Sequence, residues 1–140
     1  MSLGHRLALS VRDYECDLQG VVNNAVYQHY LEHARHELLK ANGIDFAALT
    51  RAGVDLVVVR AELDYKASLR PGDAFEVHTR LTRVSRVKFA FLQELRRVPD
   101  DRLILQAVIT GVGVNDRGRP YLPPQLLPLL DELEENGQSA

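Results

Sequence analysis

The stretch VRDYECDLQGVVNNAVY, residues 11–27, places a cluster of carboxylates directly before an amphipathic pattern. Asp13, Glu15 and Asp17 occupy every second position, so an extended backbone would direct all three side chains to one face. After Asp17 the chain becomes apolar, passes Gly20 and reaches two consecutive asparagines. The stretch therefore predicts a strand that ends in a tight bend just before a helix.

Downstream of this bend, apolar residues recur at spacings of three and four, which is typical of an amphipathic helix. Asn24 is a favourable N-cap, and Gly43 favours the end of a helix. We therefore expect a helix of about five turns between them. Its apolar face is expected to contain Tyr27, Tyr30, Leu31, Ala34, Leu38 and Ala41.

The rest of the chain has the alternation and the β-branched content of strands. One strand is expected before the quoted stretch, over residues 5–12, and a short helix is expected over 46–52. Four more strands are expected over residues 54–67, over 74–82, from 87 to a turn at 99–101, and over 103–114. A short amphipathic helix over 124–135 and a polar tail complete the chain.

This order, one strand, one long helix and then four strands, contains no repeated β–α alternation and so excludes parallel crossovers. We predict the α+β class, with an antiparallel five-stranded sheet wrapped around one long helix in a single domain of residues 1–140. The edge strands of such a sheet stay unpaired, which favours assembly with a second copy.

Composition narrows the function classes. A length of 140 residues with 46% hydrophobic residues fits one compact domain. The net charge of -2 comes from interleaved acids and bases, which argues against nucleic-acid or anionic-membrane binding. One cysteine excludes a disulfide framework, and neither a signal peptide nor an apolar run of about 18 residues is present. We expect a soluble cytoplasmic protein.

Asp17 has the most suggestive position among the three carboxylates. Gly20 permits a bend that turns Asp17 toward the N-terminus of the helix, where free N–H groups and the dipole stabilise negative charge. These N–H groups suit a thioester carbonyl that becomes an oxyanion while the carboxylate attacks it or deprotonates water. A surface aspartate before a helix is nevertheless commoner, and Asp13 and Glu15 are expected to be solvated charges.

The pattern D-x-x-G-V-V-x-N-x-x-Y, residues 17–27, resembles the signature of the hotdog-fold thioesterases of the 4-hydroxybenzoyl-CoA thioesterase family. Tyr30, Glu32, Arg35 and the segment GRPYLP at 118–123 extend the similarity over nearly the whole chain. Within this family, the stretch VRDYECDLQGVVNNAVY is similar to a bacterial and plastid subgroup that cleaves fatty acyl or β-ketoacyl thioesters. The resemblance implies an acyl-CoA thioesterase without metal or redox cofactor, assembled as a homodimer and then as a dimer of dimers.

The resemblance also implies roles for single residues. Asp17 matches the catalytic carboxylate, either nucleophile or general base, and the backbone N–H of Asn24 matches the group that polarises the thioester carbonyl. Glu32 and Arg35 are spaced for a structural i, i+3 ion pair. Tyr27 falls on the motif tyrosine and is expected to pack rather than react. The residues expected along the substrate are Gly20, Val21, Val22 and Tyr27.

Cations and a strand complete the predicted substrate contacts. Arg83, Arg86 and Lys88 surround a hairpin turn, where they are either solvated or in contact with coenzyme A phosphates. In hotdog dimers such a contact often comes from the neighbouring subunit. The segment VDLVVVR, residues 54–60, is expected to be a core strand and also a wall for the acyl chain.

Other chemistries have weaker support. Cys16 has no patterned histidine partner and is expected to pack inward. His29, His33 and His36 share a helix, but the HExxH spacing of a zinc site is absent, so no metal is predicted. The histidine pattern of hotdog dehydratases is also absent. The remaining alternatives are an acyl-carrier-protein thioesterase, a non-catalytic acyl-CoA binder and an interaction protein that assembles through its sheet edges.

Overall fold

The computed structural model describes residues 4–130 of the chain. Its helices and strands are β1 (His5–Ser10), α1 (Asn24–Ala41), α2 (Phe46–Arg51), β2 (Asp55–Tyr65), β3 (Ala74–Arg83), β4 (Lys88–Val98), β5 (Arg102–Val114) and β6 (Pro120–Tyr121). Two short 3₁₀ turns cover Asp13–Glu15 and Pro124–Leu126.

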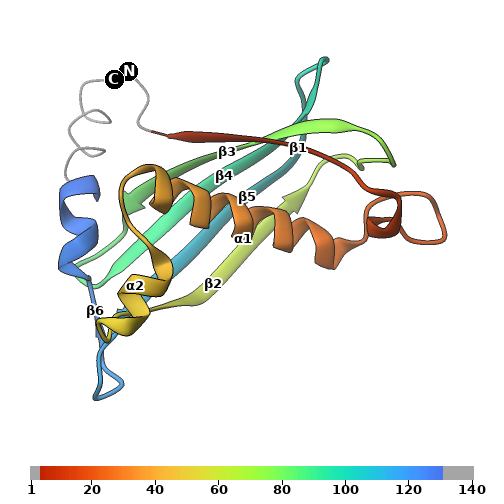
Figure 1. The fold of residues 1–140 in the computed structure, drawn as a ribbon. Coiled ribbons are helices and arrows are strands. Elements are labelled where there is room, and N and C mark those ends of the chain that lie inside the picture. The colour runs from red at the N-terminus through yellow and green to blue at the C-terminus, as the bar shows by residue number, and fades with distance from the viewer. Residues whose placement is uncertain (1–3, 131–140) are drawn as a thin grey trace.

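All strands form one antiparallel sheet in the order β1-β3-β4-β5-β2, so β1 and β2 are its edges. The two-residue β6 pairs with the end of β5 and adds a sixth strand to the predicted five. Helix α1 crosses one face of this sheet (Figure 1). The predicted α+β class, with one antiparallel sheet packed against one main helix, is therefore confirmed.

Helix α1 packs mainly against β1 and β3. Its buried face agrees with the predicted spacing except at the end, where Leu39 is buried and the predicted Ala41 is exposed. Each fully buried large side chain of this face contributes roughly 1.5–3 kcal/mol to folding. The buried residues are Tyr27, Tyr30, Leu31, Ala34, Leu38 and Leu39. The other half of the sheet, toward β2, is less covered by the helix.

The start of α1 corrects one prediction: the N-cap is Asn23, not Asn24. Asn23 has an extended backbone, and its Oδ1 accepts a 2.9 Å hydrogen bond from the N–H of Ala25. Asn24 is the first helical residue. Both asparagines satisfy the composition of a cap, so only the backbone conformation decides which one serves. At the other end, Gly43 has a φ of +79°, as the predicted helix end requires.

The carboxylates of the opening stretch do not share one face, because Asp13–Glu15 forms a 3₁₀ turn instead of an extended segment. Asp13 is exposed, as expected. The expectation of a solvated Glu15 is wrong, since its side chain is only 11% exposed. Its Oε1 accepts hydrogen bonds from the Tyr30 hydroxyl at 2.7 Å and from the Arg12 N–H at 2.8 Å.

The expected ion pair between Glu32 and Arg35 is also absent from residues 4–130. Arg35 turns inward and donates to Oε1 of the buried Gln93 at 3.2 Å. Nε2 of Gln93 in turn donates to the Leu31 carbonyl and to the Thr79 hydroxyl. Burial lowers the pKa of Arg35, and Glu32 acts in the opposite direction. A polar network thus joins the middle of α1 to β3 and β4.

The predicted C-terminal helix is only partly described. Residues 124–130 are helical, first as the 3₁₀ turn and then as α-helix, with Leu126 and Leu130 buried. Residues 131–135 and the polar tail lie outside the described residues. No helix within residues 4–130 combines the length and the apolar character needed to cross a membrane.

Candidate active site

Asp17 lies in a loop that closes like a small hairpin. Cys16 and Val22 form an antiparallel bridge at its base. The N–H of Asp17 donates to the Val21 carbonyl at 2.9 Å, and the N–H of Gly20 donates to the Asp17 carbonyl at 3.0 Å. Gly20 has a φ of +76°, a conformation that glycine adopts without strain, so the predicted bend is confirmed.

The carboxylate of Asp17 is exposed and only half engaged. Its Oδ1 accepts a 2.9 Å hydrogen bond from the N–H of Gln19, and Oδ2 has no hydrogen-bond partner among residues 4–130. The loop lines a cavity of about 350 Å³. The cavity brings together Asp17, Gln19, Val21, Val22, Asn23, Asn24, Tyr27, Tyr65, Ala67 and Ser68.

The N-terminus of α1 forms the second wall of this cavity. Asn23 occupies the N–H of Ala25 with its side chain and the N–H of Val26 with its carbonyl. The N–H of Asn24 has no acceptor within the described part of the chain. A free N–H at the positive end of a helix is a donor available to an anionic oxygen.

A third wall comes from the end of β2 and the segment after it, which no local sequence pattern places here. The N–H of Leu69 donates to the Tyr27 hydroxyl at 2.9 Å, and the Val22 N–H donates to the Leu69 carbonyl at 3.0 Å. These bonds hold Tyr65 and Ser68 beside the helix terminus. Tyr27 is 2% exposed and packs in the hydrophobic core. Its burial raises the pKa of the hydroxyl.

Two further cavities lie along α1, and neither shares a lining residue with the Asp17 cavity. The first, about 340 Å³, lies between α1 and β2 and is lined by Ala25, Gln28, His29, Leu31, Glu32, Arg35, Val58, Ala61 and Ile109. The second, about 90 Å³, shares Glu32, Arg35, Val58 and Ile109 with the first. It adds His36, Leu39, Phe46, Leu56, Val57, Phe89, Phe91 and Gly111. We call this series the α1–β2 groove, and three residues of the predicted 54–60 wall line it.

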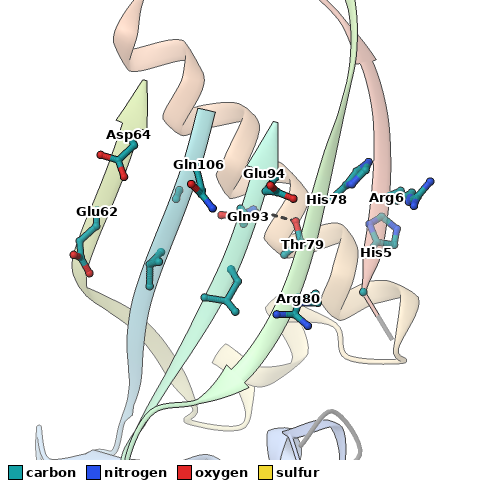
Figure 2. Close-up of a pocket in the computed structure, with 14 residues that line it drawn as sticks. His5, Arg6, Glu62, Asp64, His78, Thr79, Arg80, Gln93, Glu94 and Gln106 are labelled. Carbon is teal, nitrogen blue, oxygen red and sulfur yellow. Dashed lines mark hydrogen bonds between the residues drawn. The ribbon is translucent and has the colours of Figure 1, made fainter. Parts of the chain in front are cut away.

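Another cavity, about 700 Å³, is an open trough on the opposite face of the sheet (Figure 2). Glu62 and Asp64 on β2 form its acidic side, and His78 and Arg80 on β3 lie across from them. The trough lies away from Asp17 and from the start of α1. The smaller Asp17 cavity is therefore the candidate active site, because there a carboxylate lies beside the free N–H of Asn24 at the start of α1.

The predicted cations are not brought to Asp17 within one protomer. The loop that carries Asp17 begins where β3 begins, because the Val11 N–H donates to the carbonyl of Asp73. Arg83 ends β3 nine positions beyond Ala74, which corresponds to about 30 Å along a strand. Arg86 and Lys88 are exposed near the same hairpin turn.

The remaining reactive side chains do not assemble a second centre. Cys16 is half-buried against the core, as expected, and its burial raises the pKa of the thiol. The ring of His36 stacks near Phe46 at 4.6 Å, while His29 and His33 are exposed. Within residues 4–130, no group of three histidine, cysteine or acidic side chains is placed to hold a metal.

Solved structures of the same architecture define the class of fold. The 1,4-dihydroxy-2-naphthoyl-CoA thioesterase Slr0204 from Synechocystis superposes with a TM-score of 0.87 at 19% identity. That match covers 94% of this chain and 98% of that one. A hypothetical protein from Aquifex aeolicus superposes with a TM-score of 0.83 at 30% identity, over 90% of this chain and 98% of that one. The fold is that of the hotdog thioesterases.

The chain belongs to the Thioesterase-like superfamily, whose family model matches residues 11–136. It is 39% identical over 120 residues to the acyl-acyl carrier protein thioesterase ATL2 of Arabidopsis thaliana, a chloroplastic protein. The match covers 86% of this chain but 64% of that relative, less than two thirds of its length. The family model and the fold thus agree on the class of thioesterase-like proteins.

Proposed function

We propose that this protein hydrolyses acyl thioesters, with Asp17 as the catalytic carboxylate and the Asn24 N–H as the oxyanion donor. One observation carries the proposal: an exposed aspartate with a free oxygen shares a cavity with an unpartnered helical N–H. A pure binding protein has no chemical need for such a carboxylate. The cavity supplies the two elements that acyl transfer requires, a nucleophile or base and a positive dipole.

The proposed reaction has two forms that use the same residues. In both, the thioester carbonyl oxygen accepts a hydrogen bond from the Asn24 N–H, which polarises the carbon. In the first, Asp17 attacks this carbon, the thiolate leaves, and water hydrolyses the resulting anhydride. In the second, Asp17 takes a proton from water, the hydroxide attacks, and the tetrahedral intermediate expels the thiolate. A thiolate needs no strong general acid, which fits a cavity without a second acidic group.

The acyl group is proposed to lie in the α1–β2 groove, with Val21, Val22 and Tyr27 beside the thioester. The far end of this groove is the more apolar part, lined by Phe46, Phe89 and Phe91 among others. Apolar walls favour an acyl chain over a charged ligand. The proposed substrate is an acyl-CoA.

A second candidate substrate is an acyl-acyl carrier protein. The relative ATL2 carries that activity in its name, whereas the relative FadM of Escherichia coli is named a long-chain acyl-CoA thioesterase. FadM is 27% identical over 107 residues, less similar than ATL2. The two carriers differ outside the acyl group, so the same catalytic residues serve either.

The proposed assembly is a homodimer formed through the free edge of β2, with a dimer of dimers as the next level. Three consecutive valines of this edge, Val57, Val58 and Val59, are 43–51% exposed. An apolar unpaired edge favours pairing with another chain. Antiparallel pairing of two β2 strands would place the partner's β3–β4 turn, with its cations, at the end of the sheet that carries Asp17. The partner would thus supply the predicted phosphate contacts.

The proposed compartment is the cytoplasm, where a half-buried free thiol such as Cys16 stays reduced.

The test is thiol release from short, medium, long and aromatic acyl-CoAs and from matching acyl-carrier proteins. Wild type, Asp17→Asn and Asp13→Asn are compared, since Asp13 carries the same side chain on the same segment without lining the cavity. We expect Asp17→Asn to lose at least two decades of kcat, about 3 kcal/mol of barrier, while Asp13→Asn keeps wild-type rates. Equal rates for both variants would disprove the role of Asp17. If wild type bound these acyl thioesters without hydrolysing them, the protein would be a non-catalytic acyl binder.

A further inference from the structure

The carboxylate of Glu15 lies two residues before Asp17 and is tied to the helix rather than to solvent. Its Oε1 accepts the Tyr30 hydroxyl at 2.7 Å and the Arg12 N–H at 2.8 Å. The carbonyl of the same residue accepts the N–H of Asn23 at 3.0 Å. Glu15 therefore contacts α1 twice, once at the N-cap and once about two turns into the helix.

Tyr30 is a rigid partner for this carboxylate. Its ring is 5% exposed and lies 4.7 Å from the ring of Phe75 and 6.3 Å from the ring of Tyr27, measured between centroids. The aromatic packing fixes the ring and thereby the position of its hydroxyl oxygen. Burial and the neighbouring Glu15 both raise the pKa of Tyr30, which keeps the hydroxyl protonated as a donor.

The loop between Glu15 and Asn23 depends on where Glu15 lies. Both ends of the loop meet at the hydrogen bond from Asn23 to Glu15, and the bridge between Cys16 and Val22 follows directly inside it. Asp17 is the next residue in this closed ring. A shift of Glu15 away from the helix would therefore move Asp17 relative to the N-terminus of α1.

Resting on the proposed hydrolysis, we infer that Glu15 and Tyr30 are positioning residues, whose mutual hydrogen bond sets the place of Asp17 opposite the Asn24 N–H. Neither residue lines the Asp17 cavity, so neither is expected to touch the substrate. Small displacements of a catalytic group weaken catalysis strongly, up to about a hundredfold for 1 Å. Substrate binding depends on the groove and should change little.

The kinetic test compares Tyr30→Phe, Glu15→Ala and Glu15→Gln with wild type. We expect the first two to lower kcat by about ten- to a hundredfold with KM nearly unchanged. Glu15→Gln keeps an oxygen that can accept both donors, so its kcat should stay within about threefold of wild type. Because both damaging changes remove the same Tyr30–Glu15 hydrogen bond, the double variant Tyr30→Phe/Glu15→Ala should be no worse than the poorer single variant.

A matched control separates positioning from loss of stability. Thr79→Val also removes one buried hydrogen bond, in the Gln93 network on β3 and β4, and Thr79 is remote from the Asp17 loop. Its kcat should equal that of wild type at a similar loss of thermal stability. If Thr79→Val loses kcat as much as Tyr30→Phe, the effect is general destabilisation and the positioning role is wrong.

Amide hydrogen exchange tests the same inference without turnover. In Tyr30→Phe the N–H groups of Asp17 and Asn23, which close the loop, should exchange at least tenfold faster, and those of β4 should be unchanged. If wild type fails to hydrolyse any thioester but the loop exchange rises, the proposed function fails and the structural link stands. Unchanged loop exchange together with wild-type kcat in Tyr30→Phe overturns the inference.

Discussion

The Tyr27 hydroxyl accepts the N–H of Leu69 at 2.9 Å, although 42 positions separate the two residues. The bond lies in the core, and Leu69 is fully buried. It joins the first turn of α1 to the segment that follows β2, and so connects two walls of the candidate active site. The hydroxyl of a tyrosine in the signature motif thus binds the backbone of a segment that is distant in the chain.

Tyr27→Phe removes the only hydrogen-bond acceptor of the buried Leu69 N–H in the described structure. A buried donor without a partner costs about 1–3 kcal/mol. We expect the free energy of unfolding, measured by urea denaturation, to fall by that amount. Tyr14→Phe is the matched control, because Tyr14 is 76% exposed and its loss should be within about 0.5 kcal/mol of wild type. Equal losses in both variants would contradict the assignment.

Asn23→Ala and Asn24→Ala distinguish the two asparagines at the start of α1. Asn23 caps the helix through its side chain, so its removal should cost about 1 kcal/mol of folding stability. Asn24 is proposed to act through its backbone N–H, which alanine retains. Asn24→Ala should therefore keep both stability and kcat, as measured by urea denaturation and thiol release. If Asn24→Ala lost more folding stability than Asn23→Ala, the N-cap would be Asn24 and the assignment of Asn23 would be wrong.

The raised pKa values of Tyr27 and Tyr30 predict that the folded protein loses stability in alkaline solution. Burial raises the pKa of both hydroxyls in the folded state, so the folded protein keeps protons that the unfolded chain releases. Their contribution is fully present below the unfolded pKa of about 10 and declines as the pH rises above it. The free energy of unfolding, measured by urea denaturation at each pH, should fall less steeply with rising pH for Tyr30→Phe than for wild type. The same dependence of unfolding free energy on pH in both proteins would contradict the raised pKa of Tyr30.

Gly111→Ala tests the far end of the α1–β2 groove. A Cβ at this position would lie 3.0 Å from two ring carbons of Phe89 and 3.1 Å from the carbonyl oxygen of Val57. We expect overpacking to lower the free energy of unfolding by about 1–3 kcal/mol. The displaced Phe89 ring should narrow the groove, so hydrolysis of long acyl chains should fall more than that of short ones. An unchanged ratio between chain lengths would mean that the acyl group lies elsewhere.

Val59→Lys tests the proposed dimer edge. Val59 is 51% exposed on β2, and a lysine on an edge strand opposes pairing with another strand. Light scattering after size-exclusion chromatography should give a dimer for wild type and a monomer for the variant. Val84→Lys is the matched control, since this valine is 53% exposed but lies at the β3–β4 turn. A monomeric wild type, or a dimeric Val59→Lys, would refute pairing through β2.

Local patterns in the sequence predicted the parts of the site that are local in the chain. The apolar spacing of α1 and the bend at Gly20 each depend on neighbouring residues, and both occur as expected. The cap was misplaced by one position, because Asn23 and Asn24 are chemically identical and only backbone conformation separates them. The 3₁₀ turn at Asp13–Glu15 was missed because alternating residues alone favoured an extended segment.

Contacts between distant segments were beyond the sequence pattern. Glu15 meets Tyr30 across 15 positions and Arg35 meets Gln93 across 58, so neither partner can be read from local spacing. Spacing on the helix suggested Glu32 as the partner of Arg35, but a buried glutamine on β4 offered a closer acceptor. The direction of a long side chain is thus set by packing, which only the fold reveals.

Helix α1 covers the β1–β3 half of the sheet more than the β2 half, and this difference separates two sets of residues. Side chains between α1 and the β1–β3 half hold the fold together, whereas residues such as Val57 and Val58 line the groove while remaining 43% and 50% exposed. Exposed positions contribute little to stability, so substitutions there are tolerated more easily than core changes. A substitution in this wall should therefore act on substrate choice and on pairing through β2 before it acts on the folded core.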